Sequence, residues 1–118
     1  MILKDVIENV DAVKPNAFTN EQKTRWISEV EGRIQSEIFL FAPAQVIAYE
    51  WATDMNTELL AAPPHDRIYG EYLTAMIDFN NGEYNRYNNT VQVFNADFME
   101  FMRWFAKHYR PADKIEDI

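Results

Sequence analysis

The fold is decided by residues 66–77, whose sequence is DRIYGEYLTAMI. Apolar side chains recur in this stretch at i, i+3, i+4 and i+7, namely Tyr69, Tyr72, Leu73 and Met76. That spacing places side chains on one face of an α-helix. Pro63 and Pro64 precede the stretch, and His65 or Asp66 is a suitable N-cap. The stretch therefore predicts a helix that packs one face in a core.

This helix, the third along the chain, is predicted to continue from about Asp66 to about Asn88, across Gly82. Residues 80–82 are Asn-Asn-Gly, a typical stop signal, yet Tyr84 and Tyr87 keep the phase of the earlier apolar face. A glycine inside a helix costs only about 1 kcal/mol relative to alanine. Burial of two tyrosines should offset that cost.

The last helix is predicted from about Val91 to Tyr109, before Pro111. Its core face carries Phe94, Phe98, Phe101, Met102, Phe105 and Tyr109. Trp104 falls about 120° away on the helical wheel, near Val93 and His108. This second patch is exposed, covered by the N-terminal helix, or part of an interface, where tryptophan is a common anchor.

Two helices are predicted before the third. Apolar spacing from Ile2 to Val13 indicates the first, and Pro15 stops it. Thr19 and Gln22 form a capping box for the second. Its apolar face reaches to about residue 39 through Ile27, Val30, Ile34 and Ile38.

Residues 39–64 break this helical pattern and predict an arm between the second and third helices. Its centre, residues 45–51, is β-branched and aromatic without helical spacing. The arm is predicted to be irregular, or a β-hairpin-like element around residues 54–56. Its candidate interface residues are Val46, Ile47, Tyr49 and Trp51, and the alternative is that they pack beneath their own domain. The fold class expected is all-α, with residues 1–112 as a single helical domain and 113–118 as a frayed acidic tail.

Composition narrows the function. The chain has 118 residues, 47% of them hydrophobic, with no cysteine and a net charge of −8. Without cysteine there is no disulfide or thiolate site, as expected for a reducing cytosol. Charges close to Met1 argue against a signal peptide, and nowhere do eighteen apolar residues run together, so no membrane segment is expected. The acidic charge opposes specific nucleic-acid binding.

Tests for catalytic and ligand-binding motifs fail. Neither His65 nor His108 follows a carboxylate at the spacing of di-iron or zinc motifs. Three glycines supply no phosphate-binding loop. We therefore expect no catalytic residue, no cofactor and no metal, and a protein that is not an enzyme. The run from Glu83 to Asn89 places tyrosines beside Arg86, and it either stacks on single-stranded nucleic acid or closes the core.

Nearly all of residues 1–111 resembles a group of small proteins encoded in tailed-phage and prophage structural gene clusters. The features that carry the resemblance are Val10–Asn16 with Lys23 and Trp26, Leu59–Tyr69 with Tyr72 and Leu73, Ile77–Glu83, Arg86–Asn89, Phe94–Asn95, and the Trp104–Phe105 helix that ends at Arg110–Pro111. More loosely, the chain is similar to the head-tail connector, or adaptor, proteins of long-tailed phages. The arm from Phe39 to Glu58 is longer and more aromatic than the loop of many connectors.

The resemblance implies a four-helix, connector-like subunit of the virion neck, made in the bacterial host cytoplasm. Such subunits form a homo-oligomeric ring under the portal and also contact tail or neck proteins. An acidic lumen would let DNA slide without sticking. A tail-completion protein, a helical adaptor or regulatory module that binds one other protein, and an enzyme or nucleic-acid binder with an unrecognised site remain as alternatives.

Overall fold

The computed structural model describes residues 1–108 of the chain. Its helices are α1 (Leu3–Val13), α2 (Asn20–Arg33), the π-helix η1 (Ile34–Ile38), the 3-10 helix η2 (Pro43–Gln45), α3 (Trp51–Asp54), α4 (Arg67–Asn80) and α5 (Tyr84–His108). The predicted all-α class is confirmed for these residues. Tyr109, the domain end at 112 and the tail 113–118 lie outside the described residues.

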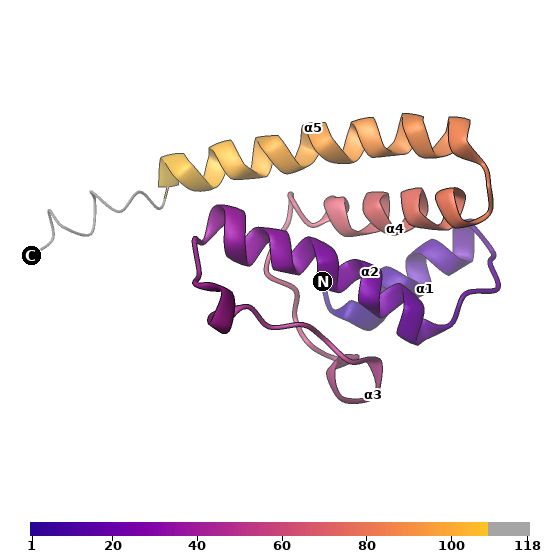
Figure 1. The fold of residues 1–118 in the computed structure, drawn as a ribbon, viewed down its shortest axis with the longest axis horizontal. Coiled ribbons are helices and arrows are strands. Elements are labelled where there is room, and N and C mark those ends of the chain that lie inside the picture. Colours follow the sequence, from indigo (N-terminus) through magenta and orange to yellow (C-terminus); the bar gives the residue numbers. More distant parts are fainter. Residues whose placement is uncertain (109–118) are drawn as a thin grey trace, which may run out of the picture.

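Helix α4 is the centre of the fold. It lies alongside α5 on one side and contacts α1 and α2 on the other (Figure 1). Because neighbours cover it from several directions, its burial is wider than the single predicted face. Ile68, Tyr69, Leu73 and Ile77 are buried, whereas the predicted core residues Tyr72 and Met76 are only half-buried.

The first two helices follow their sequence signals. Helix α1 ends at Val13, shortly before Pro15. At the start of α2, the Thr19 side chain accepts from the Gln22 amide at 3.1 Å, and the Gln22 side chain accepts from the Thr19 amide at 3.0 Å. The predicted capping box is therefore present. The second helix reaches Ile38, but its last five residues form a π-helix.

The predicted continuous third helix is wrong, because the chain turns between Asn80 and Tyr84. Gly82 has φ +78°, a conformation that glycine adopts at little steric cost. The Gly82 amide donates to the Phe79 carbonyl at 3.1 Å, and the Glu83 amide to the Asp78 carbonyl at 2.9 Å. These bonds satisfy carbonyls at the end of α4.

The turn decides where α5 packs. By reversing the chain, it lays α5 back along α4 and buries Phe94 and Phe98 in the core. A straight helix would have carried both away from it. Tyr84 and Tyr87 therefore belong to α5 and pack against Phe79 at the turn, with ring centroids 5.6 and 5.0 Å apart.

The hairpin alternative for the arm is also wrong. Residues 51–54 form the short helix α3, and the Asp54 carboxylate accepts from the Glu50 amide at 2.8 Å. The arm pairs with the start of the chain instead of with itself. The Leu3 amide donates to the Thr57 carbonyl, the Leu59 amide donates to the Met1 carbonyl, and an antiparallel bridge joins Ile2 to Glu58.

Two glycine substitutions test the turn. Gly82→Ala should lower the free energy of unfolding by about 1–2 kcal/mol, because alanine is strained at positive φ. Gly70→Ala, inside α4, should raise it by up to about 1 kcal/mol. An added Cβ at Gly70 would lie 3.7 Å from a Val10 methyl, an ordinary contact. Urea unfolding measures both. A stabilising Gly82→Ala would contradict the turn.

Candidate functional site

A stripe of polar side chains on one side of the second helix holds the arm. Ser28, Glu31 and Gln35 follow one another at spacings of three and four, so they share a helical face. The Ser28 hydroxyl accepts from the Tyr49 amide at 2.9 Å. Gln35 binds both backbone groups of Ile47, accepting from its amide at 2.9 Å and donating to its carbonyl at 3.0 Å. This stripe replaces the partner strand that a hairpin would have supplied.

Glu31 is the centre of the stripe and is fully buried. Its carboxylate accepts from the hydroxyls of Tyr49 and Tyr69 and from the Leu60 amide. Burial raises the pKa of Glu31, and the three donors oppose that rise. Burial and the nearby carboxylate likewise raise the pKa of both tyrosines above their ordinary value. Glu31 thereby links α2, the arm and α4.

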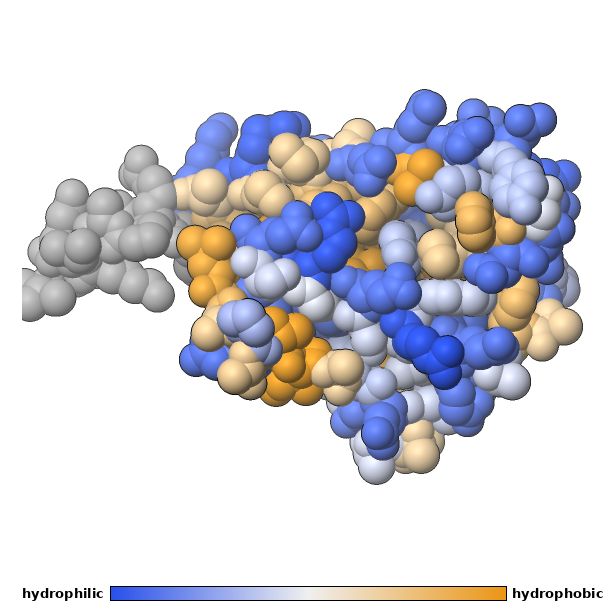
Figure 2. Space-filling view, viewed as in Figure 1, coloured by the Kyte–Doolittle hydropathy of each residue, from blue (hydrophilic) through white to orange (hydrophobic). Residues whose placement is uncertain are grey.

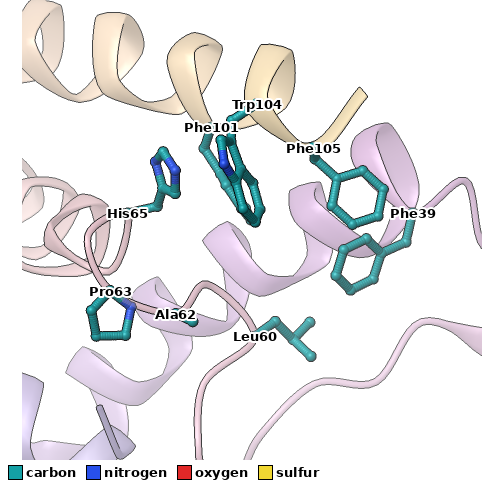
Figure 3. Close-up of a pocket in the computed structure, with 8 residues that line it drawn as sticks. All are labelled: Phe39, Leu60, Ala62, Pro63, His65, Phe101, Trp104 and Phe105. Carbon is teal, nitrogen blue, oxygen red and sulfur yellow. The ribbon is translucent and has the colours of Figure 1, made fainter. Parts of the chain in front are cut away.

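Two surfaces are candidates for binding a partner. The first is an apolar pocket of about 280 Å³ between the arm and the end of α5. It is lined by Phe39, Leu60, Ala62, Pro63, His65, Phe101, Trp104 and Phe105. Figure 3 shows the rings of Phe39 and Phe105 facing each other at one side of it. Their centroids are 5.0 Å apart, and Trp104 lies 5.0 Å from the His65 ring. Seven of the eight lining residues are apolar, and His65 is the exception.

Exposed apolar side chains extend this surface. Leu40 is 73% exposed and has φ 59°, which is uncommon for a residue other than glycine. The Phe41 ring lies 5.6 Å from that of Phe39. Figure 2 shows apolar side chains gathered at the end of the molecule where η1 leads toward η2. We call the pocket together with Leu40 and Phe41 the apolar end.

The second surface is a hollow of about 330 Å³ beside α3, here called the α3 hollow. It is lined by Glu21, Thr24, Arg25, Tyr49, Glu50, Trp51 and Ala52. Both carboxylates are on exposed residues, and the two aromatic residues are half-buried. Carboxylates beside aromatic rings suit a cationic group.

The structure separates the seven residues predicted as interface. Tyr49 and Trp51 line the α3 hollow, Ile47 is 63% exposed, and Val46 packs over Gly32. Packing beneath their own domain therefore holds in part for Tyr49 and Trp51, which contact the core, and does not hold for Ile47. The interface role of the arm stays a prediction.

On α5, Trp104 and His108 come together, with rings stacked at 4.8 Å. Trp104 is 37% exposed, and the His65 ring lies against it. This neighbour belongs to the segment before α4 and not to the N-terminal helix. Val93 is 51% exposed and lies about three turns earlier on α5, apart from Trp104.

Sequence reasoning missed most of the pocket lining. Leu60 and His65 reach it because residues 58–66 cross below α5, a path that no spacing rule predicts. Phe105 was assigned to the core face of α5, yet it is only partly buried and lines the pocket. The adjacent prolines, Pro63 and Pro64, were the available signal that the chain changes direction there.

The carboxyl groups of Glu71 and Asp97 form a pair in which the pKa of Glu71 is raised. Burial, together with a hydrogen bond to Asp97 and the charge of that carboxylate, raises the pKa of Glu71 to about 8, and Arg67 partly opposes the rise. The Arg67 side chain lies 3.4 Å from Asp97. Because the pair joins α4 to α5 and lines neither surface described above, we interpret it as a structural contact between helices.

Comparison with known proteins found no matching family model, curated protein or solved structure. Within residues 1–108, no group of three or more histidines and carboxylates lies close enough to hold a metal ion. None of the helices in the same range is long and apolar enough to cross a membrane. The resemblance to phage connectors therefore stays a prediction.

Gln35→Ala tests the arm contacts. The variant loses two hydrogen bonds to Ile47, each contributing about 1 kcal/mol, so amide exchange at Ile47 should accelerate roughly 10- to 30-fold. Ser36→Ala is the control, because among residues 1–108 the Ser36 hydroxyl bonds only within its own helix, to the Gly32 carbonyl at 2.7 Å. Hydrogen exchange followed by NMR measures both variants. If the Ile47 amide exchanges at the same rate in Gln35→Ala and in Ser36→Ala, Gln35 does not hold the arm.

The Glu71 pair predicts a pH dependence. Since the folded pKa of about 8 is above the ordinary carboxyl pKa of 4.5, the folded state keeps a proton that the unfolded state loses. Its contribution to stability is full below about pH 4.5 and is lost as the pH rises through 8. Glu71→Gln should therefore be more stable than wild type at pH 9 and show a smaller difference at pH 5. Urea midpoints at both pH values test this, with the exposed Glu100→Gln as control. A difference independent of pH would refute the assignment.

Proposed function

We propose that this chain is a structural subunit that assembles with copies of itself and with other proteins. The observation that carries the proposal is the apolar end. A pocket of about 280 Å³ lies just below the range of small-molecule sites, so it suits one or two apolar side chains of a protein partner. Exposed apolar groups around such a hollow are typical of interaction surfaces.

The finer proposal is a head-tail connector of a tailed-phage neck, located in the virion and forming a ring under the portal. Support comes from the resemblance described above and from four long helices with an arm between the second and the third of them. The net charge of −8 is suited to a channel through which DNA passes without binding. A non-catalytic role follows from the failed motif tests.

The proposal is tested by mixing the purified chain with the portal protein encoded nearest to its gene and imaging the product by negative-stain microscopy. Rings attached to the portal are the expected result. Attachment to a tail protein alone would favour the tail-completion alternative. A monomer that binds one other protein in a fixed complex would favour the adaptor.

Trp104→Ala should separate assembly from folding. The variant should lose assembly while its free energy of unfolding falls by about 1–2 kcal/mol. The loss is limited because the Trp104 side chain is partly exposed and its ring contact with His65 is at the surface. Removal of a fully buried large side chain would cost about 3–5 kcal/mol. Met99→Ala, also on α5 and 46% exposed, is the control and should change neither quantity. Sedimentation and thermal unfolding provide the measurements. A large loss of stability without an assembly defect would place Trp104 in the core.

A further inference from the structure

The distribution of ion pairs singles out three cations. Within residues 1–108, six of the lysines and arginines pair with a carboxylate, namely Lys4, Lys14, Lys23, Arg33, Arg67 and Arg86. In the same range Arg25, Arg103 and Lys107 make no ion pair with a described carboxylate. Two of these three lie one helical turn apart at the end of α5, and both are exposed. We call Arg103 and Lys107, two exposed cations in a chain of net charge −8, the basic end of α5.

The α3 hollow has the opposite character. Glu21 and Glu50 are exposed and, within the described residues, are not in ion pairs. Arg25 lies in the same hollow, so the two carboxylates leave it with a formal charge of −1. The Tyr49 and Trp51 rings supply faces over which a guanidinium or ammonium group is attracted.

We propose that the α3 hollow of one copy binds the basic end of α5 of a second copy. Arg103 and Lys107 meet Glu21 and Glu50, while the partly exposed Trp104 and the exposed Ile47 add apolar contact. The inference rests on the proposed function, because it names the contact through which copies of the subunit assemble.

The position of the two surfaces shows that the contact joins different copies. Helix α3 lies at the edge of the molecule opposite α5 (Figure 1), so a single copy does not close the contact on itself. Two different surfaces then meet at every junction. A reciprocal pair of such contacts gives a two-fold dimer, whereas head-to-tail repetition closes into a ring when the rotation between copies permits and otherwise continues as a filament.

A charge exchange tests the contact. One variant carries Glu21→Lys and Glu50→Lys, and the other carries Arg103→Glu and Lys107→Glu. Each variant alone should remain monomeric, with the thermal unfolding of wild type, because all four positions are exposed. An equimolar mixture should restore assembly with a strict 1:1 composition. Gln92→Lys, at an exposed position on α5 about three turns before Arg103, should assemble as wild type does. Wild-type assembly should also weaken as the salt concentration rises.

Sedimentation velocity measures self-association, and portal binding is measured separately. Assembly of either variant alone, or failure of the mixture to recover, would overturn the contact. If the variants assemble and the wild type still forms rings on the portal, the proposed function stands without this contact. If the mixture recovers but the portal is not bound, the contact stands and the neck assignment falls. A wild type that remains monomeric alone and with the portal would overturn both.

Discussion

The buried Glu31 carboxylate and its neighbours Ser28 and Gln35 are the interaction on which the rest of the structure depends. Residues 39–66 contain only two short helical turns, and a segment of that length has many backbone groups that need partners. The polar stripe supplies partners for Tyr49, Ile47 and Leu60 from one helix face. Without it, the arm would be held chiefly by its pairing with the start of the chain at Thr57 and Leu59.

Glu31 also connects the two surfaces. Its carboxylate accepts from Tyr49, which lines the α3 hollow, and from Leu60, which lines the apolar pocket. Removing a carboxylate from water is costly unless donors surround it, and here three donors do so. The same three bonds that offset this cost therefore fix the positions of both candidate binding surfaces relative to α4.

Electrostatics limits how copies of this chain approach one another. A net charge of −8 produces a general repulsion between copies, so association requires places where opposite charges meet. Most cations of the described residues are already held within the molecule; Lys14, for example, lies 2.6 Å from the buried Asp78. Of the three described cations without an ion pair, Arg25 lies among the carboxylates of the α3 hollow, which leaves Arg103 and Lys107 at the end of α5 to attract an acidic surface of a partner. Apolar contact then contributes the stability of the complex.

The sequence by itself determined the local structure. The spacing of Val6, Ile7 and Val10 and the Thr19 capping box depend on residues within a few turns, so they were predicted correctly. The same holds for the buried part of the α5 face, which is Phe94, Phe98 and Phe101. Tertiary structure decided the turn at Gly82, because helical phase is the same whether the chain continues or reverses, and only packing of α5 on α4 selects reversal. It also decided the arm and both surfaces. Glu31 lies 29 residues before Leu60 and 38 before Tyr69, and partners that distant are chosen by the assembled core, not by sequence spacing.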